Sequence, residues 1–236
     1  MNPFSKRGLF SWLSLLAGAV GLALRFWLLS CVDNRGLLPK YHIAGILSIL
    51  LLVLIMGVLL YVLRTAAPSK AYRRLFPPSR LAAVGTLLGA IGMGVSAFTL
   101  EGTGILRLLV PALGILGAIA LAITAYYRFI GLRPNCLLHG AVIVFFIFRT
   151  LVCCRMWGAE PQLQLYLFPL LACLALLLAC YFRAEADAVM GDYRRYVFFA
   201  QTALFCCCLS LPGEDWLFYL SAGIWVATDF CLLPEE

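Results

Sequence analysis

The sequence predicts an all-α fold, a polytopic integral membrane helical bundle with about eight transmembrane helices. Three observations predict it: hydrophobic residues make up 64% of the 236 residues, charged residues only 12%, and the charges cluster between long uncharged runs. Soluble domains carry about a quarter charged residues. The mean hydropathy of +0.98 agrees with helices that lipid surrounds. We therefore expect a single transmembrane domain over residues 1–236.

The expected spans follow the uncharged runs and the ionisable residues that flank them. A helix needs about 20 residues to cross about 30 Å of hydrocarbon. Runs such as LSILLLVLIMGVLLYVL are apolar on every side and lack the alternation of a β-barrel strand. The spans cover 9–31, 41–64, 81–100, 107–128, 135–155, 162–183, 195–212 and 215–233. They form four helical hairpins with short outer turns.

The basic residues predict the orientation of these hairpins. With the N-terminus inside, 12 of the 18 Lys and Arg residues lie in inner segments, and the loop 64–80 alone carries five. The positive-inside rule therefore favours an N-in/C-in topology. Basic inner loops against anionic headgroups also explain the net charge of +7 without nucleic acid. We expect a multi-pass protein of the cytoplasmic membrane, with the lipid bilayer as its partner.

Polar residues near the outer ends of the spans suggest a pocket. Arg25 and Arg149 each stand close to an outer helix end. Either their aliphatic portions lie along the helix so that the guanidinium groups reach the membrane interface, or the two arginines face one another across an outward-opening pocket that binds an anion. Gln162 and Gln164 precede Pro169, which is expected to kink its span and free a backbone carbonyl. Transporters build sites from broken helices of this kind.

A second set of charged residues lies at the inner ends. Apart from Asp215, the first residue of the last span, Asp229 is the only carboxylate within a span, so it is either a proton carrier or an interfacial residue paired with Arg128 or Arg183. Arg183 and Asp187 are four residues apart and can pair on one helix face. They serve either as an inner gating salt bridge or as part of a cytoplasmic turn. In the second interpretation one helix ends at Met190 and the next begins at Asp192.

Glycines mark a close helix contact in the third span. Gly85 and Gly89 form a small-xxx-small stripe, which lets two helix backbones approach. The span 81–100 is therefore expected either to pack centrally in the bundle or to form a homodimer face. Residues 18–23, GAVGLA, also resemble residues 89–94, GAIGMG, so a duplication of the first two hairpins stays open.

Enzyme and metal motifs are missing from the sequence. It has no HExxH, GxSxG or P-loop motif and no CxxC spacing. The two histidines, His42 and His139, open helices on opposite faces of the predicted membrane, so they cannot share a metal or haem. No cofactor and no metal are predicted. A disulfide between Cys31 and either Cys153 or Cys154 stays open.

The stretches VDNRGLLPKYH, residues 32–42, and RMWGAEPQLQ…GDYRR, residues 155–195, resemble polytopic membrane proteins of gut Clostridia of about this length. The resemblance implies a bacterial inner-membrane protein and assigns no activity or catalytic residue. Our first hypothesis is a small-solute transporter or permease with an outward-facing polar pocket. The second is a non-catalytic membrane subunit, sensor or scaffold that holds a second copy or a membrane protein partner. The third is a lipid-modifying membrane enzyme.

Overall fold

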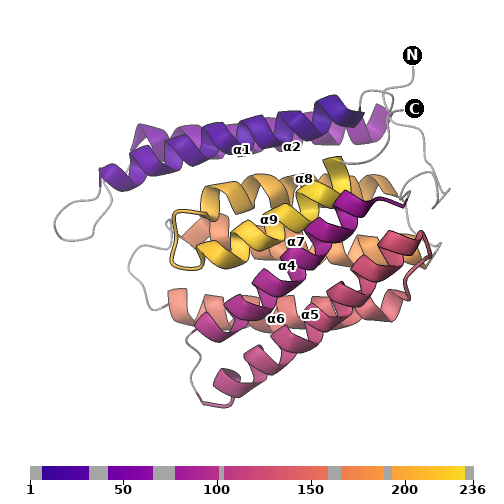
Figure 1. Ribbon diagram of the computed structural model, residues 1–236. Helices are drawn as coiled ribbons and strands as arrows, with labels where there is room; N and C mark the ends of the chain where they lie inside the picture. Colours follow the sequence, from indigo (N-terminus) through magenta and orange to yellow (C-terminus); the bar gives the residue numbers. More distant parts are fainter. Residues whose placement is uncertain are drawn as a thin grey trace.

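The computed structural model describes residues 7–31, 42–65, 78–100, 104–158, 166–188 and 193–231, and these ranges contain eight α-helices and no strand (Figure 1). The helices are α1 (Arg7–Ser30), α2 (Ile43–Thr65), α4 (Arg80–Thr99), α5 (Leu106–Ile130), α6 (Cys136–Trp157), α7 (Leu167–Asp187), α8 (Tyr193–Ser210) and α9 (Trp216–Cys231). The predicted all-α fold is confirmed. Each helix overlaps one expected span.

Six of the helices close a ring. α4 packs against α5, α5 against α6, α6 against α7, α7 against α8, α8 against α9, and α9 returns to α4. We call this arrangement the six-helix ring. α1 and α2 pair with one another and pack on α8 from outside (Figure 1). The two sequences that suggested a duplication, in α1 and α4, therefore occupy different surroundings.

The bundle has two distinct ends, because consecutive helices run in opposite directions (Figure 1). The end at which α8 stops and α9 starts, on the left in Figure 1, is called the Asp215 end. The opposite end, where α5 stops, α6 starts and α7 stops, is called the Asp187 end. α1 begins and α9 stops at the Asp187 end (Figure 1). All sites described below belong to one of these two ends.

The outer surface of the bundle is apolar. Five described helices, α2, α4, α5, α6 and α7, are long and apolar enough to cross a membrane. Large aliphatic side chains point away from the protein along them, such as Leu54, Val84 and Leu116, each more than half exposed. α8 needs less apolar sequence because α1, α2, α7 and α9 surround it with protein. These features indicate a multi-pass membrane protein.

The glycine stripe of α4 lies against α9. A Cβ at Gly85 would overlap the side chain of Thr228, and one at Gly89 would stand 2.5 Å from the Cβ of Trp225. The two backbones approach because neither glycine carries a side chain. α4 is nevertheless not central, since its other face is exposed. The central helix is α8, where every residue from 200 to 207 is buried.

Candidate functional site

Local sequence signals position Arg128 and His139 at the Asp187 end. Gly131 adopts a left-handed conformation, φ 76°, and its N–H bonds to the carbonyl of Tyr127. This glycine therefore ends α5 three residues after Arg128. Asn135 then caps α6, because its side chain accepts a hydrogen bond of 3.1 Å from the N–H of Leu137. That cap places His139 in the first turn of α6.

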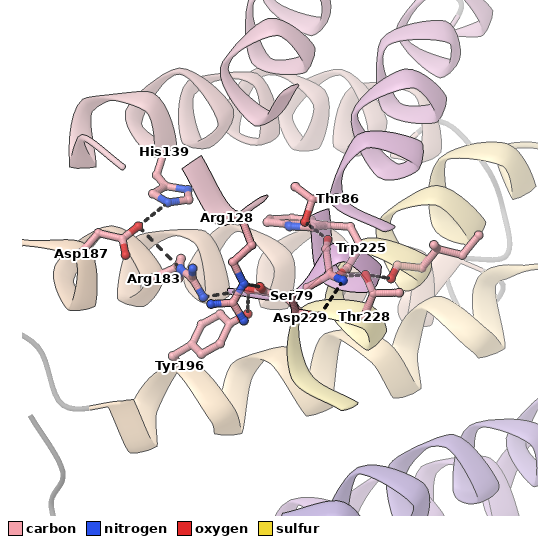
Figure 2. A network of polar contacts seen from close by, with 12 residues as sticks. Ser79, Thr86, Arg128, His139, Arg183, Asp187, Tyr196, Trp225, Thr228 and Asp229 are labelled. Carbon is pink, nitrogen blue, oxygen red and sulfur yellow. Dashed lines mark hydrogen bonds and ion pairs between the residues drawn. The ribbon is translucent and has the colours of Figure 1, made fainter. Parts of the chain in front are cut away.

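Five helices of the ring bring six polar side chains together at this end (Figure 2). We call the set the Asp187 cluster. Its members are Arg128 on α5, His139 on α6, Arg183 and Asp187 on α7, Tyr196 on α8 and Asp229 on α9, and each is at most 5% exposed. Charges buried to this degree in a membrane helix bundle are costly unless they pair.

Asp229 receives partners from three other helices. Its Oδ2 accepts hydrogen bonds of 2.8 Å from Arg183 Nη1 and of 2.8 Å from the Tyr196 hydroxyl. Its Oδ1 lies 3.5 Å from Arg128 Nε. The carboxylate therefore connects α9 to α5, α7 and α8, and two cations compensate its charge.

Asp187 joins α7 to α6. Its Oδ2 lies 2.6 Å from His139 Nε2 and 3.5 Å from Arg183 Nε, as Figure 2 shows. Among the described residues, His139 Nδ1 and Asp187 Oδ1 have no hydrogen-bond partner. The cluster thus contains a chain of contacts, from His139 through Asp187, Arg183 and Asp229 to Arg128.

An aromatic layer separates this cluster from the Asp215 end. Phe145 and Phe146 on α6 and Phe218 on α9 are at most 1% exposed. The ring centroid of Phe218 lies 6.4 Å from that of Phe145 and 6.0 Å from that of Phe146. These side chains fill the interior of the six-helix ring with apolar volume.

A second ionic contact lies on the other side of the aromatic layer. Arg149 on α6 is fully buried, its guanidinium carbon stands 3.7 Å above the Phe218 ring, and its Nη2 lies 3.1 Å from Asp215 Oδ2. Such a cation–π contact partly replaces lost hydration. The Asp215 side chain is 18% exposed, so this carboxylate reaches both the buried arginine and the surface.

A cavity of about 190 Å³ opens beside Asp215. We call it the Asp215 cavity. Its walls include Arg25 from α1, Tyr166 and Pro169 at the start of α7, and Tyr219 from α9. Glu214 and Trp157 also line it, and the rings of Trp157 and Tyr166 stack with centroids 4.9 Å apart. The cavity therefore holds both signs of charge and an aromatic wall.

The structure arranges the expected outer pocket differently. Arg25 lines the Asp215 cavity, whereas Arg149 lies behind Asp215 and pairs with it. The two arginines therefore do not form a common anion site, because a carboxylate already compensates Arg149. Gln162 and Gln164 lie outside the described residues.

Pro169 does not kink a helix in the described structure. α7 begins at Leu167, so the proline occupies the first turn, where its missing N–H has no intrahelical acceptor. The carbonyl of Pro169 instead lies 3.4 Å from the Tyr219 hydroxyl, which donates to it. The proline therefore marks the start of α7 at the cavity. The carbonyl that a kink at Pro169 would free is that of Leu165, four residues earlier, and it lies outside the described residues.

At the Asp187 end, the structure brings together all three expected inner residues, Arg183, Asp187 and Asp229. α7 ends at Asp187, and the expected boundaries at Met190 and Asp192 lie outside the described residues. Arg128 and Arg183 both contact Asp229, although the sequence argument offered them as alternatives.

His139 and Tyr196 were not predicted as members of a site from the sequence. The signal was present in α6, where His139, Val142, Phe146, Arg149 and Cys153 follow one another at intervals of three and four residues and are all buried. This spacing puts them on a single helix face. In a helix that is apolar all round, polar residues at that spacing indicate the inward face.

Cysteines and metal ligands add no further site to the described ranges. Cys31, Cys153 and Cys154 are free thiols in the structure, so neither pairing left open by the sequence is formed. No group of three or more His, Cys, Asp or Glu side chains in the described part of the chain is placed to hold a metal ion.

Comparisons of the chain with family models, with curated proteins and with solved structures find no match. Function is therefore argued from geometry. His139 and Arg149 are ten residues apart on α6, so about 15 Å of helix separates the two ionic sites. The described helices thus hold a cavity lined by groups of both charges at one end and a buried cluster of ionisable side chains at the other.

Proposed function

We propose that the chain is a membrane transporter for a small charged solute, with the interior of the six-helix ring as its path. One observation supports this most: ion pairs with a buried arginine lie on both sides of an aromatic layer, and only the pair with Asp215 reaches the surface. Charges within membrane helices are rare and mark solute or ion pathways. Arg149, Pro169 and Asp229 are all buried and therefore do not lie on the apolar outer surface.

The proposal includes the topology. Eight spans with both termini inside would place the Asp215 end outside and the Asp187 end in the cytoplasm. The Asp215 cavity would then open outward, and the aromatic layer would be the barrier that a moving solute must pass. The bacterial cytoplasmic membrane is the proposed location.

The walls of the Asp215 cavity favour a zwitterionic solute. Arg25 supplies a positive group, and Glu214 and Asp215 supply negative ones. A molecule with one carboxylate and one ammonium group would satisfy both, whereas a simple anion would meet the two acids. The stacked Trp157 and Tyr166 rings would contact its apolar part.

Uptake into proteoliposomes tests the proposal. Radiolabelled small monocarboxylates, primary amines and amino-acid zwitterions are supplied separately, and we expect uptake of zwitterions. Asp215→Asn should lower that uptake at least tenfold, since it removes the carboxylate that joins the cavity to Arg149. Arg107→Gln is the matched control, because Arg107 is exposed near the same end. Uptake of no class, or equal uptake by the Asp215 variant, would contradict the proposal.

A second candidate is a non-catalytic membrane subunit. The observation that favours it is the α1–α2 hairpin, which lies outside the ring and exposes large apolar side chains such as Leu50 and Leu54 of α2. A subunit of this kind should leave the membrane in mild detergent as part of a stable complex. Recovery of a monodisperse single chain would count against it.

A further inference from the structure

We infer that the Asp187 cluster is a proton-binding site, in which a proton on His139 decides whether Arg183 links α7 to α9 or pairs within α7. The cluster has one imidazole, two guanidinium groups, two carboxylates and one phenol, all buried. With a proton on His139, positive and negative groups alternate along the contact chain from His139 to Arg128.

His139 is the only member of the cluster suited to exchange a proton near neutral pH. Imidazole ordinarily changes charge between pH 5 and 8, and guanidinium does not lose its proton in proteins. Each carboxylate lies beside cationic partners from its neighbours, which favours the ionised form. The Tyr196 hydroxyl already donates to Asp229.

All helices that contribute to the cluster set the response to that proton. α5 presents Arg128, α7 presents Arg183 and Asp187, α8 presents Tyr196, and α9 presents Asp229. With neutral imidazole the four remaining charges sum to zero. With imidazolium the cluster gains one positive charge, which Asp187 at 2.6 Å compensates directly.

The distances are compatible with the protonated arrangement. The 2.6 Å contact between His139 and Asp187 is as short as a charge-assisted hydrogen bond. Arg183 meanwhile lies closer to Asp229, at 2.8 Å, than to Asp187, at 3.5 Å. In that arrangement the imidazolium holds Asp187, and the shorter contact of Arg183 crosses from α7 to α9.

Loss of the proton should reverse this preference. Neutral His139 no longer compensates Asp187, so Arg183 becomes the only cation beside that carboxylate in the cluster. Arg183 then moves toward Asp187, four residues further along its own helix, and its bond to Asp229 weakens. α9 loses one of its attachments to the ring, because Asp229 keeps only Arg128 and Tyr196.

This proton site does not depend on transport, but its use as a coupling step rests on the proposed function. Proton binding from the cytoplasmic side would fix α9, and proton release would loosen it on the far side of the aromatic layer from the Asp215 cavity. Two measurements test these points separately. One follows the protonation of the His139 imidazole, and the other follows the attachment of α9 to the ring.

The imidazole is measured by NMR of protein labelled with ¹⁵N-histidine in lipid nanodiscs. The chain has two histidines, so His42→Asn leaves His139 as the single imidazole. Asparagine is chosen because His42 Nδ1 accepts from the N–H of Ala44 at the start of α2, and Asn can replace that acceptor. We expect both ring nitrogens to be protonated at pH 5 and one of them at pH 9. Ring signals that stay constant from pH 5 to 9 would overturn the proton site.

The helix contact is measured by amide hydrogen exchange of α9, corrected for the intrinsic effect of pH. In His42→Asn, the amide exchange rate of α9 should rise at least tenfold as the pH is raised and His139 loses its proton. In His139→Gln, the amide exchange of α9 should be fast at every pH, since the glutamine side chain carries no charge. In Asp187→Asn, the amide exchange of α9 should be slow at every pH, because Asp229 is then the one carboxylate of the cluster with which Arg183 can pair.

The two variants have opposite expected results, so a general loss of stability cannot produce both. Equal pH dependence in the histidine control and in His139→Gln would overturn the inference, as would fast exchange in Asp187→Asn. A titrating His139 with the expected exchange, together with absent solute uptake, would leave the proton site standing and would contradict only the transporter proposal.

Discussion

Arg183 bonds two carboxylates on two different helices while only 2% of its surface is exposed. At the scale of single residues, the Asp187 cluster is explained by such sharing. Each arginine and each aspartate of the cluster has at least one opposite charge within 3.5 Å, which offsets part of the cost of removing it from water. The cost of burying Arg149 is offset in the same way, by the carboxylate of Asp215 and by the aromatic ring of Phe218.

Replacement of Asp229 by Asn should destabilise the protein strongly. The change leaves Arg183 and Arg128 without the carboxylate that they share, and loss of one partner from a buried ion pair costs about 3–5 kcal/mol. Thermal unfolding in detergent measures the effect. Glu214→Gln is the control, because Glu214 is exposed and should leave the unfolding temperature unchanged. Equal unfolding temperatures for both variants would contradict the role of Asp229.

At the scale of elements, hydropathy predicted the existence and type of the helices, because each had to satisfy its backbone within an apolar run. It did not predict which faces turn inward, since helices such as α2 are apolar all round. Arg183, Asp187 and Asp229 were identified because ionisable groups are rare there. His139 was missed because its partner Asp187 lies 48 residues away on another helix.

Pro169 was interpreted as a kink because the start of its helix could not be located within an apolar run. The structure begins α7 at Leu167, only two residues before the proline. Likewise, the glycine stripe predicted a close contact but not its partner. Small residues specify how near another helix can come, and only the fold specifies that this helix is α9.

The contact between α4 and α9 yields a prediction at this scale. Gly85→Ala should lower stability by about 1–3 kcal/mol, because its methyl group would overlap Thr228. Gly57→Ala is the matched control, since a Cβ there meets nothing within 4 Å and alanine favours a helix. Thermal unfolding of both purified variants compares them. An unfolding temperature that is the same for Gly85→Ala as for the unmodified protein would contradict the contact.

At the scale of the whole molecule, the ring and the outer hairpin could not be foreseen from the order of the spans. Four successive hairpins describe the chain, yet the contacts group the helices as six and two, with the first hairpin on the outside of α8. Any order of antiparallel helices satisfies the hydropathy pattern equally. Side-chain complementarity between distant segments, such as Ser14 with Gln201, decides among them.

The orientation in the membrane is a prediction for the whole molecule. Both ends of the chain should lie in the cytoplasm, because the Asp187 end carries most of the arginines in the described ranges. Green fluorescent protein fused to the C-terminus should fluoresce, and alkaline phosphatase inserted after Gly213 should be active. Active phosphatase at the C-terminus instead would reverse the topology and, with it, the side to which the Asp215 cavity opens.

The shortness of α9 has an electrical consequence. Fourteen residues separate Asp215 from Asp229, which corresponds to about 21 Å of helix, less than the hydrocarbon thickness of about 30 Å. In a bilayer, at least one of the two ionic sites would then lie inside the hydrocarbon, within the electric field of the membrane. A charge that moves between the two sites would therefore change in energy by a fraction of the roughly 2.3 kcal/mol per 100 mV that a full crossing of the membrane involves.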